Sequence, residues 1–206
     1  MKGEDEDDNV ELRKVLEPRS FSFEPKEHWA LAEVNGWIDF ERGVKLAKSR
    51  FSVLRGEAAR LERALINFFL DTNATKGFEE LCVPFMNNAS MLQGTGQLPK
   101  FGDDLFKIDD EDLYLIPTAE VPITNLFRDE IVNANDLPIT RTGYTPCFRR
   151  EAGSYGSHVR GLNRLHQFDK VEIIRVEHPS KSYEALDKMV AHVQDILKEL
   201  ELPYRI

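Results

Sequence analysis

The sequence predicts an α+β fold in which an antiparallel sheet is flanked by helices. The expected elements run helix, strand, strand, helix, two long strands and helix, and this order differs from the regular alternation that builds a parallel sheet. The two long strands are expected at about 141–152 and 164–176, on either side of a glycine-rich connection. Strands that are linked in this way usually pair antiparallel.

Helices are expected where apolar residues recur every three to four positions. One helix is expected over 27–34 and a longer one from 56 to about 71. A third begins near Thr118 and carries Pro122 in its first turn, where the missing N–H costs little. The last is expected over 183–200, with a buried face made of Leu186, Met189, Val190, Val193, Ile196, Leu197 and Leu200.

The shorter segments between these elements are bounded by proline and glycine. Strands are expected over 78–84, ending at a proline, and over 113–116. Residues 87–104 contain three glycines and a proline and predict an irregular loop. The acidic run over 1–9 predicts a solvated leader, and we expect one domain over 10–206.

The composition excludes several classes of protein. With a net charge of −9, the chain as a whole does not attract nucleic acid, and no apolar run approaches the roughly 20 residues that span a bilayer. The two cysteines, Cys82 and Cys147, and the five histidines lack the spacing of a metal site, so we expect no metal ligands in this chain. Reduced thiols and the lack of a targeting segment predict a cytoplasmic protein.

The two long strands carry side chains that suit a nucleotide. Alternation along a strand places Arg149 and Glu151 on one face of the first strand. Taken alone, this pair is typical of a surface salt bridge. One face of the second strand, however, carries an aromatic ring between charged side chains. An aromatic ring suits a planar base, arginines suit phosphates, and a carboxylate suits an ammonium group. The residues of this face are Arg164, His166, Phe168, Lys170 and Glu172.

At these residues the chain resembles the seryl-tRNA synthetase family of class II aminoacyl-tRNA synthetases. The stretches TPCFRREAGSYG at 145–156 and RGLNRLHQFDKVE at 160–172 are similar to that family's second class II motif with its loop. LIPTAE at 115–120 resembles its serine-binding turn. The helix and strand over 59–84 resemble its first motif, which forms the dimer interface. The resemblance runs from about Val10 to the end of the chain.

The resemblance implies roles for the matching residues. Arg149 would be the catalytic residue, because it holds both the α-phosphate of ATP and the serine carboxylate. Serine would be bound by Thr118, Ala119, Glu120, Arg149 and Glu172. Two of these residues have an alternative role, because Thr118 could equally serve as a helix N-cap and Glu172 as an exposed strand carboxylate. ATP would be bound by residues that contact its phosphates, its adenine amino group and the face of its ring: Arg149, Arg150, Glu151, Arg164, Leu165 and Phe168.

The family usually has a small residue where this chain has Arg150. Because alternation turns Arg150 away from Arg149, we expect the difference to leave the site intact.

The resemblance also implies a reaction and its partners. ATP would activate L-serine as seryl-adenylate, and the seryl group would pass to tRNA(Ser) through an arm preceding residue 1. The class II core would be incomplete at its C-terminus, because the third motif and the Mg²⁺ ligands are expected beyond Ile206. We therefore expect the chain by itself to be inactive, and we expect a homodimer with no membrane contact.

Two alternatives remain open. One is a non-catalytic synthetase paralogue that acts as a binding or dimerisation module. The other is an amino acid–carrier protein ligase, whose relatives bind the amino acid through zinc.

Overall fold

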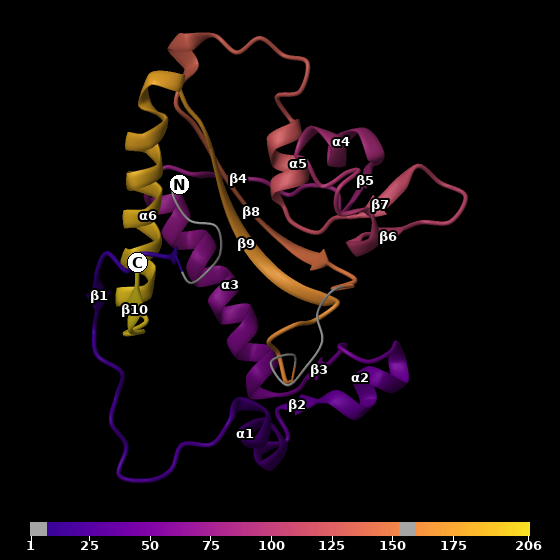
Figure 1. Ribbon diagram of the computed structural model, residues 1–206, viewed down its shortest axis with the longest axis vertical. Helices are drawn as coiled ribbons and strands as arrows, with labels where there is room; N and C mark the ends of the chain where they lie inside the picture. The colour runs from indigo at the N-terminus through magenta and orange to yellow at the C-terminus, as the bar shows by residue number, and fades with distance from the viewer. Residues whose placement is uncertain (1–7, 153–159) are drawn as a thin grey trace. The chain divides into compact units, whose positions relative to one another are not determined.

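The computed structural model describes residues 8–152 and 160–206 of the chain (Figure 1). It divides into two units, one spanning residues 26–178 and one that joins the N-terminal segment up to Pro25 to residues 179–206. The expected division into a leader over 1–9 and a domain over 10–206 stays a prediction, and residues 1–7 of that leader lie outside the described residues.

The larger unit is built on a three-stranded sheet with the order β4-β8-β9. Strands β8 (Ile139–Phe148) and β9 (Gln167–Val176) pair antiparallel, with Gly143 opposite Glu172. This confirms the predicted pair, although both strands are shorter than predicted at the ends that face the glycine-rich connection. Strand β4 (Glu79–Glu80) pairs parallel with β8, so the sheet is mixed at this edge.

Helix α3 (Glu57–Thr75) packs on one face of the β8–β9 pair (Figure 1). It extends beyond the predicted end because Asn73, which is buried, donates from Nδ2 to Thr142 Oγ1 over 2.8 Å. Thr142 in turn donates to the backbone oxygen of Glu172 over 2.8 Å. A buried polar chain therefore ties the helix to both long strands.

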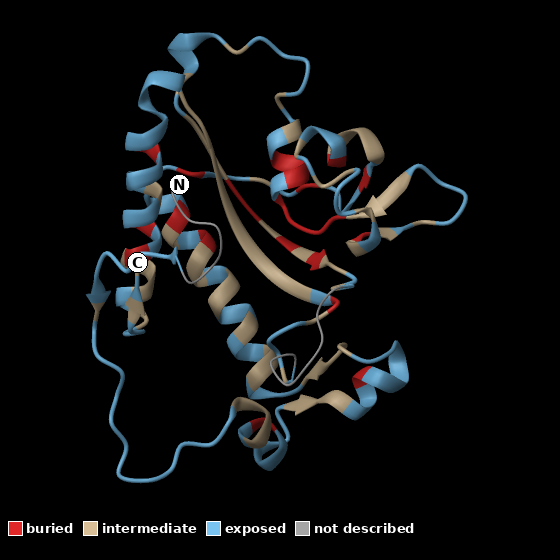
Figure 2. Ribbon diagram, viewed as in Figure 1, coloured by how far each residue is buried: buried red, intermediate tan, exposed pale blue. Residues whose placement is uncertain are grey.

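Helix α5 (Glu120–Asn125) packs on the opposite face, where Ile123 and the N-cap residue Ala119 form a core cluster with Val83. Gly143 allows this close approach, because a Cβ at that position would lie 3.0 Å from Ile123 Cδ1. In Figure 2 the buried residues concentrate on α5 and on β8 beside it. The start of α5 is therefore held against the sheet.

A second sheet, of order β5-β7-β6, stands beside α5. It consists of β5 (Met86–Asn88), β7 (Leu113–Leu115) and β6 (Phe106–Lys107), all antiparallel. Helix α4 (Ala89–Gly94) and a 3-10 turn, η2 (Gly102–Asp104), lie within the segment predicted as an irregular loop. That prediction was wrong for α4 and β5, because these short elements form around a core of Leu92, Leu105 and Val121.

The remaining elements of the larger unit lie at its N-terminal end and before β8. Helix α1 (His28–Asn35) ends at Gly36, whose φ of 64° is left-handed and favours glycine. Strands β2 (Ile38–Asp39) and β3 (Val53–Leu54) pair antiparallel around α2 (Phe40–Leu46). A 3-10 turn, η3 (Ala134–Asp136), precedes β8.

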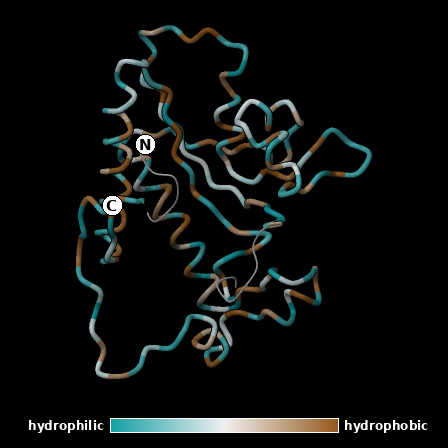
Figure 3. Tube along the Cα trace, viewed as in Figure 1, coloured by the Kyte–Doolittle hydropathy of each residue, from teal (hydrophilic) through white to brown (hydrophobic). Residues whose placement is uncertain are grey.

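The smaller unit contains α6 (Ser182–Glu199), the 3-10 turn η5 (Pro179–Lys181) and the pair formed by β1 (Lys14–Val15) and β10 (Tyr204–Arg205). Hydrophobic and hydrophilic positions alternate along α6 (Figure 3), but its predicted buried face is wrong at three positions. Leu186, Val190 and Val193 are exposed, and the buried residues are Ala185, His192 and Gln194. Within this unit, α6 contacts the β1–β10 segments through Gln194, which accepts from Arg13 and from Tyr204, and no apolar element among the described residues of the unit covers the three exposed residues. No helix among the described residues is long and apolar enough to cross a membrane.

Candidate functional site

A cavity of about 570 Å³ lies between the start of α5 and the ends of β8 and β9. Its wall includes five of the residues chosen from the sequence: Thr118, Glu120, Arg149, Glu151 and Arg164. It also includes Gln97 and Asp104, to which the sequence assigned no role, and Lys170, which the sequence placed on the nucleotide-suited face of the second long strand. Segments that are far apart in the sequence thus converge on one polar cavity.

Thr118 links the start of α5 to the middle of β9. Its side chain is 4% exposed, and its Oγ1 donates to Glu172 Oε2 over 2.7 Å. The same hydroxyl accepts from the backbone N–H of Glu120 at 3.3 Å, but the N-cap of α5 is Ala119, so the alternative assignment of Thr118 as the N-cap is wrong. Ala119 is fully buried in the core, between the two polar residues. It therefore anchors the turn in the core, while its neighbours Thr118 and Glu120 line the cavity.

Lys170 belongs to this wall, although sequence reasoning assigned it no individual role. Its Nζ lies 2.5 Å from Glu172 Oε2, the oxygen that also accepts from Thr118. Alternation along β9 places Lys170 and Glu172 on the same face, and that signal was available in the sequence. One carboxylate oxygen therefore receives two donors, which hold Glu172 in a single orientation.

Arg149 is fixed by its backbone and by its side chain. Its N–H donates to the backbone oxygen of His166 at 2.9 Å, and its carbonyl oxygen lies 3.0 Å from His166 Nδ1. Its Nε donates to the backbone oxygen of Pro117 over 3.2 Å. The guanidinium carbon lies 5.1 Å from the centre of the Phe168 ring, a cation–π arrangement. Arg149 therefore sits between the Thr118 turn and the aromatic ring.

Leu165 and Phe168 lie around a neighbouring cavity of about 470 Å³ that is also lined by Phe51 and Leu54. Neither residue is part of the wall of the larger cavity. The sequence placed Arg164, His166 and Phe168 on one strand face, but β9 begins only at Gln167. His166 is instead a buried residue whose ring packs against Phe51 and Phe106.

Glu151 reaches the cavity by a route other than the predicted one. The strand ends at Phe148, so strand alternation does not apply to Arg149 and Glu151. Glu151 has a left-handed φ of 51°, and its Oε2 lies 3.5 Å from Arg164 Nη1. Arg150 is exposed and does not line the cavity. Residues 153–156 of the motif lie outside the described residues.

The described part of the chain offers no metal centre. None of its histidine, cysteine, aspartate and glutamate residues form a group of three or more that could hold a metal ion. Cys82 is exposed and Cys147 is buried, and both are free thiols. Burial raises the pKa of Cys147, which keeps this thiol protonated beside the cavity.

Comparison with known proteins gives consistent matches. Residues 105–206 match the model of the tRNA synthetase class II core domain of the G, H, P, S and T type. The serine–tRNA ligase of Sulfurovum sp. (strain NBC37-1) is 74% identical over 204 residues, covering 99% of this chain and 49% of the relative. That of Sulfurimonas denitrificans is 60% identical, with 99% and 49% covered.

Solved structures agree with these matches. The seryl-tRNA synthetase from Pyrococcus horikoshii complexed with ATP superposes with a TM-score of 0.94 at 37% identity, covering 98% of this chain and 50% of that one. The cytoplasmic serine–tRNA ligase from Naegleria fowleri in complex with AMP gives 0.93 at 31% identity, with 98% and 49% covered. The predicted fold class is thereby confirmed, and the chain spans about half the length of the curated relatives it matches.

Proposed function

This chain belongs to the seryl-tRNA synthetase family of class II aminoacyl-tRNA synthetases, and on that premise we propose that it takes part in ATP-dependent activation of L-serine and its transfer to tRNA(Ser). In the first step a serine carboxylate oxygen attacks the α-phosphorus of ATP, and pyrophosphate leaves. In the second, a 3′-terminal ribose hydroxyl of the tRNA attacks the seryl carbonyl carbon, and AMP leaves. Positioning and charge stabilisation are the work that such a reaction asks of the protein.

The serine end of the site would be formed by Thr118 and Glu120 of the cavity wall and by Glu172, which contacts Thr118 and Lys170 of that wall but does not itself line the cavity. These residues offer a hydroxyl and two carboxylates, which suit a substrate ammonium group and a substrate hydroxyl. The contact of Thr118 and Lys170 with Glu172 Oε2 is the observation that supports the proposal, because it positions the Glu172 carboxylate next to the cavity wall without a ligand. Alanine would leave the groups that bind the serine hydroxyl unpaired, which explains selectivity for serine.

The nucleotide end would be formed by Arg149, Glu151, Arg164 and Phe168. The fixed fork of Arg149 suits an α-phosphate next to a carboxylate. Glu151 would accept from the adenine amino group, and Arg164 would approach the phosphates. Phe168, with Leu165 beside it, would stack on the adenine. Arg150, which lies outside the cavity wall, would contribute to ATP binding from there.

Mg²⁺ would neutralise phosphate charge in this reaction. The described residues do not fit that role by themselves, because they contain no group of three potential ligands. We therefore assign no Mg²⁺ ligand in this chain.

The further partners are also proposals. A homodimer is supported by the resemblance of residues 59–84 to the family's first motif, and sedimentation equilibrium tests it. A net charge of −9 requires that any contact with tRNA be local. A cytoplasmic location is supported by the two free thiols.

Binding of a non-hydrolysable seryl-adenylate, 5′-O-(N-L-seryl)sulfamoyladenosine, tests the proposal by calorimetry. We expect the chain to bind this compound in preference to its alanyl counterpart. Arg149→Ala should abolish binding, whereas Arg60→Ala, which removes an exposed arginine paired with Glu57 on α3, should leave it unchanged. Equal affinity for the seryl and alanyl compounds would contradict the proposed function.

A further inference from the structure

The turn that follows β8 holds Glu151 in an unusual backbone conformation. Its φ of 51° lies in the left-handed region, which costs free energy for a residue with a side chain. The result is that the Glu151 side chain is only 10% exposed and faces the cavity beside Arg164. Something in the surrounding structure must hold this conformation, because a relaxed backbone would turn the carboxylate elsewhere.

Asp104 accepts hydrogen bonds from the residues on both sides of Glu151. The backbone N–H of Arg150 donates to the backbone oxygen of Asp104 over 2.8 Å. The backbone N–H of Ala152 donates to the carboxylate Oδ1 of the same residue over 2.7 Å. A third bond, from Arg50 Nη1 to the backbone oxygen of Glu151 at 3.1 Å, holds the residue between them.

Asp104 is itself held rigidly by its neighbours. It ends the 3-10 turn η2, and its N–H donates to the backbone oxygen of Phe101 over 3.0 Å. The next residue, Leu105, is 3% exposed and packs in the core with Leu92 and Val121. The two hydrogen bonds that Asp104 accepts therefore connect the Glu151 turn to the core of the second sheet.

We propose that Asp104 is a positioning residue that fixes Glu151 for recognition of the adenine base. This inference rests on the proposed function, in which Glu151 accepts from the exocyclic amino group of adenine. A base with an oxygen in place of that amino group, such as hypoxanthine, presents an acceptor that the carboxylate repels. Asp104 thus determines the selectivity for adenine nucleotides through the backbone of Glu151.

Calorimetric affinities for AMP and IMP test this inference, with the ratio of the two as the readout. Asp104→Ala removes the acceptor of the Ala152 N–H, and we expect the AMP preference to fall by roughly five- to tenfold. Asp104→Asn keeps an oxygen acceptor and should retain the preference. Asp103→Ala, at the exposed neighbouring position in the same turn, is the matched control and should behave as the unaltered chain. If Asp104→Ala does not fold, Asp104→Glu takes its place, because it displaces the carboxylate by one methylene group.

The outcomes separate this inference from the function on which it rests. An unaltered chain that binds AMP and IMP equally overturns the assignment of Glu151 and the proposed function with it. A preference that survives in Asp104→Ala overturns only the role of Asp104. The same holds if both nucleotides weaken equally, since that indicates general destabilisation. If Asp104→Asn loses the preference as completely as Asp104→Ala, the charge of Asp104 is what matters. That result would overturn the inference that Asp104 acts through its hydrogen bonds.

Discussion

The hydroxyl of Thr118 donates to Glu172 Oε2 over 2.7 Å and so joins two residues that are 54 positions apart. The bond ties the start of α5 to the middle of β9, and Lys170 meets the same oxygen at 2.5 Å. Hydrogen bonds to an ionised carboxylate are stronger than those between neutral groups. The wall is therefore preorganised, and removing one donor has a measurable effect.

Thr118→Val removes the hydroxyl and nearly preserves the shape of the side chain. We expect the affinity for 5′-O-(N-L-seryl)sulfamoyladenosine to fall about tenfold, because the Glu172 carboxylate loses the hydrogen bond from Thr118 that orients it. The affinity for AMP should remain, since the change is at the serine end. Calorimetry with the two ligands measures both. Thr124→Val, at an exposed position of α5, is the control, and an equal loss in that variant would refute the assignment.

Lys170→Met removes the cation that holds Glu172 and keeps a side chain of similar length. We expect the preference for the seryl over the alanyl sulfamoyladenosine to fall several-fold, because Glu172 is then held by Thr118 alone. Competitive binding of the two compounds gives this ratio.

Lys188→Met is the matched control, since Lys188 forms an ion pair with Glu184 over 2.6 Å on the exposed surface of α6. Such pairs contribute little. Equal ratios in Lys170→Met and in the unaltered chain would show that Lys170 does not orient the carboxylate.

Phe168→Leu removes the aromatic ring that lies 5.1 Å from the guanidinium carbon of Arg149. Stacking on a base is worth about 1–3 kcal/mol, so we expect the affinity for AMP to fall at least fivefold. Fluorescence titration with an adenine nucleotide measures the change. Phe85→Leu, at an exposed position outside both cavities, should have no effect. Unchanged AMP affinity in Phe168→Leu would exclude stacking on this ring.

Sequence reasoning succeeded where long elements carry a repeated pattern. The β8–β9 pair and α3 were predicted because apolar and charged residues alternate regularly along them. Helix α4 was missed because a six-residue helix that ends in a glycine has no local signal, and it depends on the burial of Leu92. Its stability comes from tertiary contacts that a single stretch of sequence does not contain.

The site shows the same division between local and long-range information. Arg149 and Glu151 do line one cavity, but the reason given for them was wrong, since the strand stops before both residues. The turn that follows depends on Asp104, which belongs to a distant segment. Contacts between segments of this kind leave no spacing signal. The roles assigned to these residues stay predictions until binding is measured.

Thr142 links α3 to both long strands from a fully buried position. Thr142→Val removes the acceptor of Asn73 Nδ2 and the donor to the Glu172 backbone oxygen. We expect the free energy of unfolding to fall by about 1–3 kcal/mol, because a buried amide loses this partner. Urea denaturation measures the change. Thr142→Ser retains the hydroxyl and should retain more of the stability than the valine variant, so a reversed order would contradict the account.

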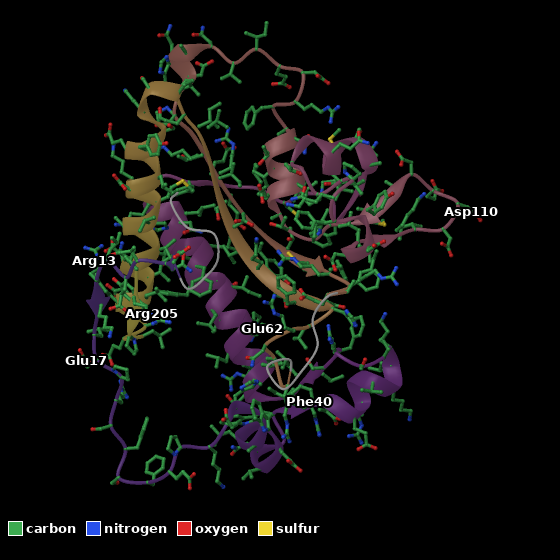
Figure 4. The ribbon with its side chains drawn as sticks, in the orientation of Figure 1. Arg13, Glu17, Phe40, Glu62, Asp110 and Arg205 are labelled. Atoms are coloured by element: carbon green, nitrogen blue, oxygen red, sulfur yellow. The ribbon has the colours of Figure 1, made fainter. Side chains whose placement is uncertain are left out.

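Glu62 gives the fold a pH dependence. It projects from α3 toward the β8–β9 strands (Figure 4). Burial, reinforced by a hydrogen bond with Asp169, raises its pKa from 4.5 to about 7. Asp169 also accepts from Tyr144 Oη over 2.8 Å, and burial raises the pKa of that phenol to about 12. Glu62 therefore titrates near neutral pH.

The sign of the pH dependence follows from the direction of this shift. Because the pKa of Glu62 is raised, the folded state binds more protons than the unfolded state between pH 4.5 and about 7. The contribution of Glu62 to stability therefore falls as the pH rises through this window and is constant above it. Glu62→Gln imitates the protonated acid, so we expect it to stabilise the chain more at pH 8 than at pH 5. Urea denaturation at the two pH values measures the difference, with Asp71→Asn on the exposed side of α3 as the control. A stabilisation by Glu62→Gln that is equal at both pH values would show that Glu62 does not hold the proton.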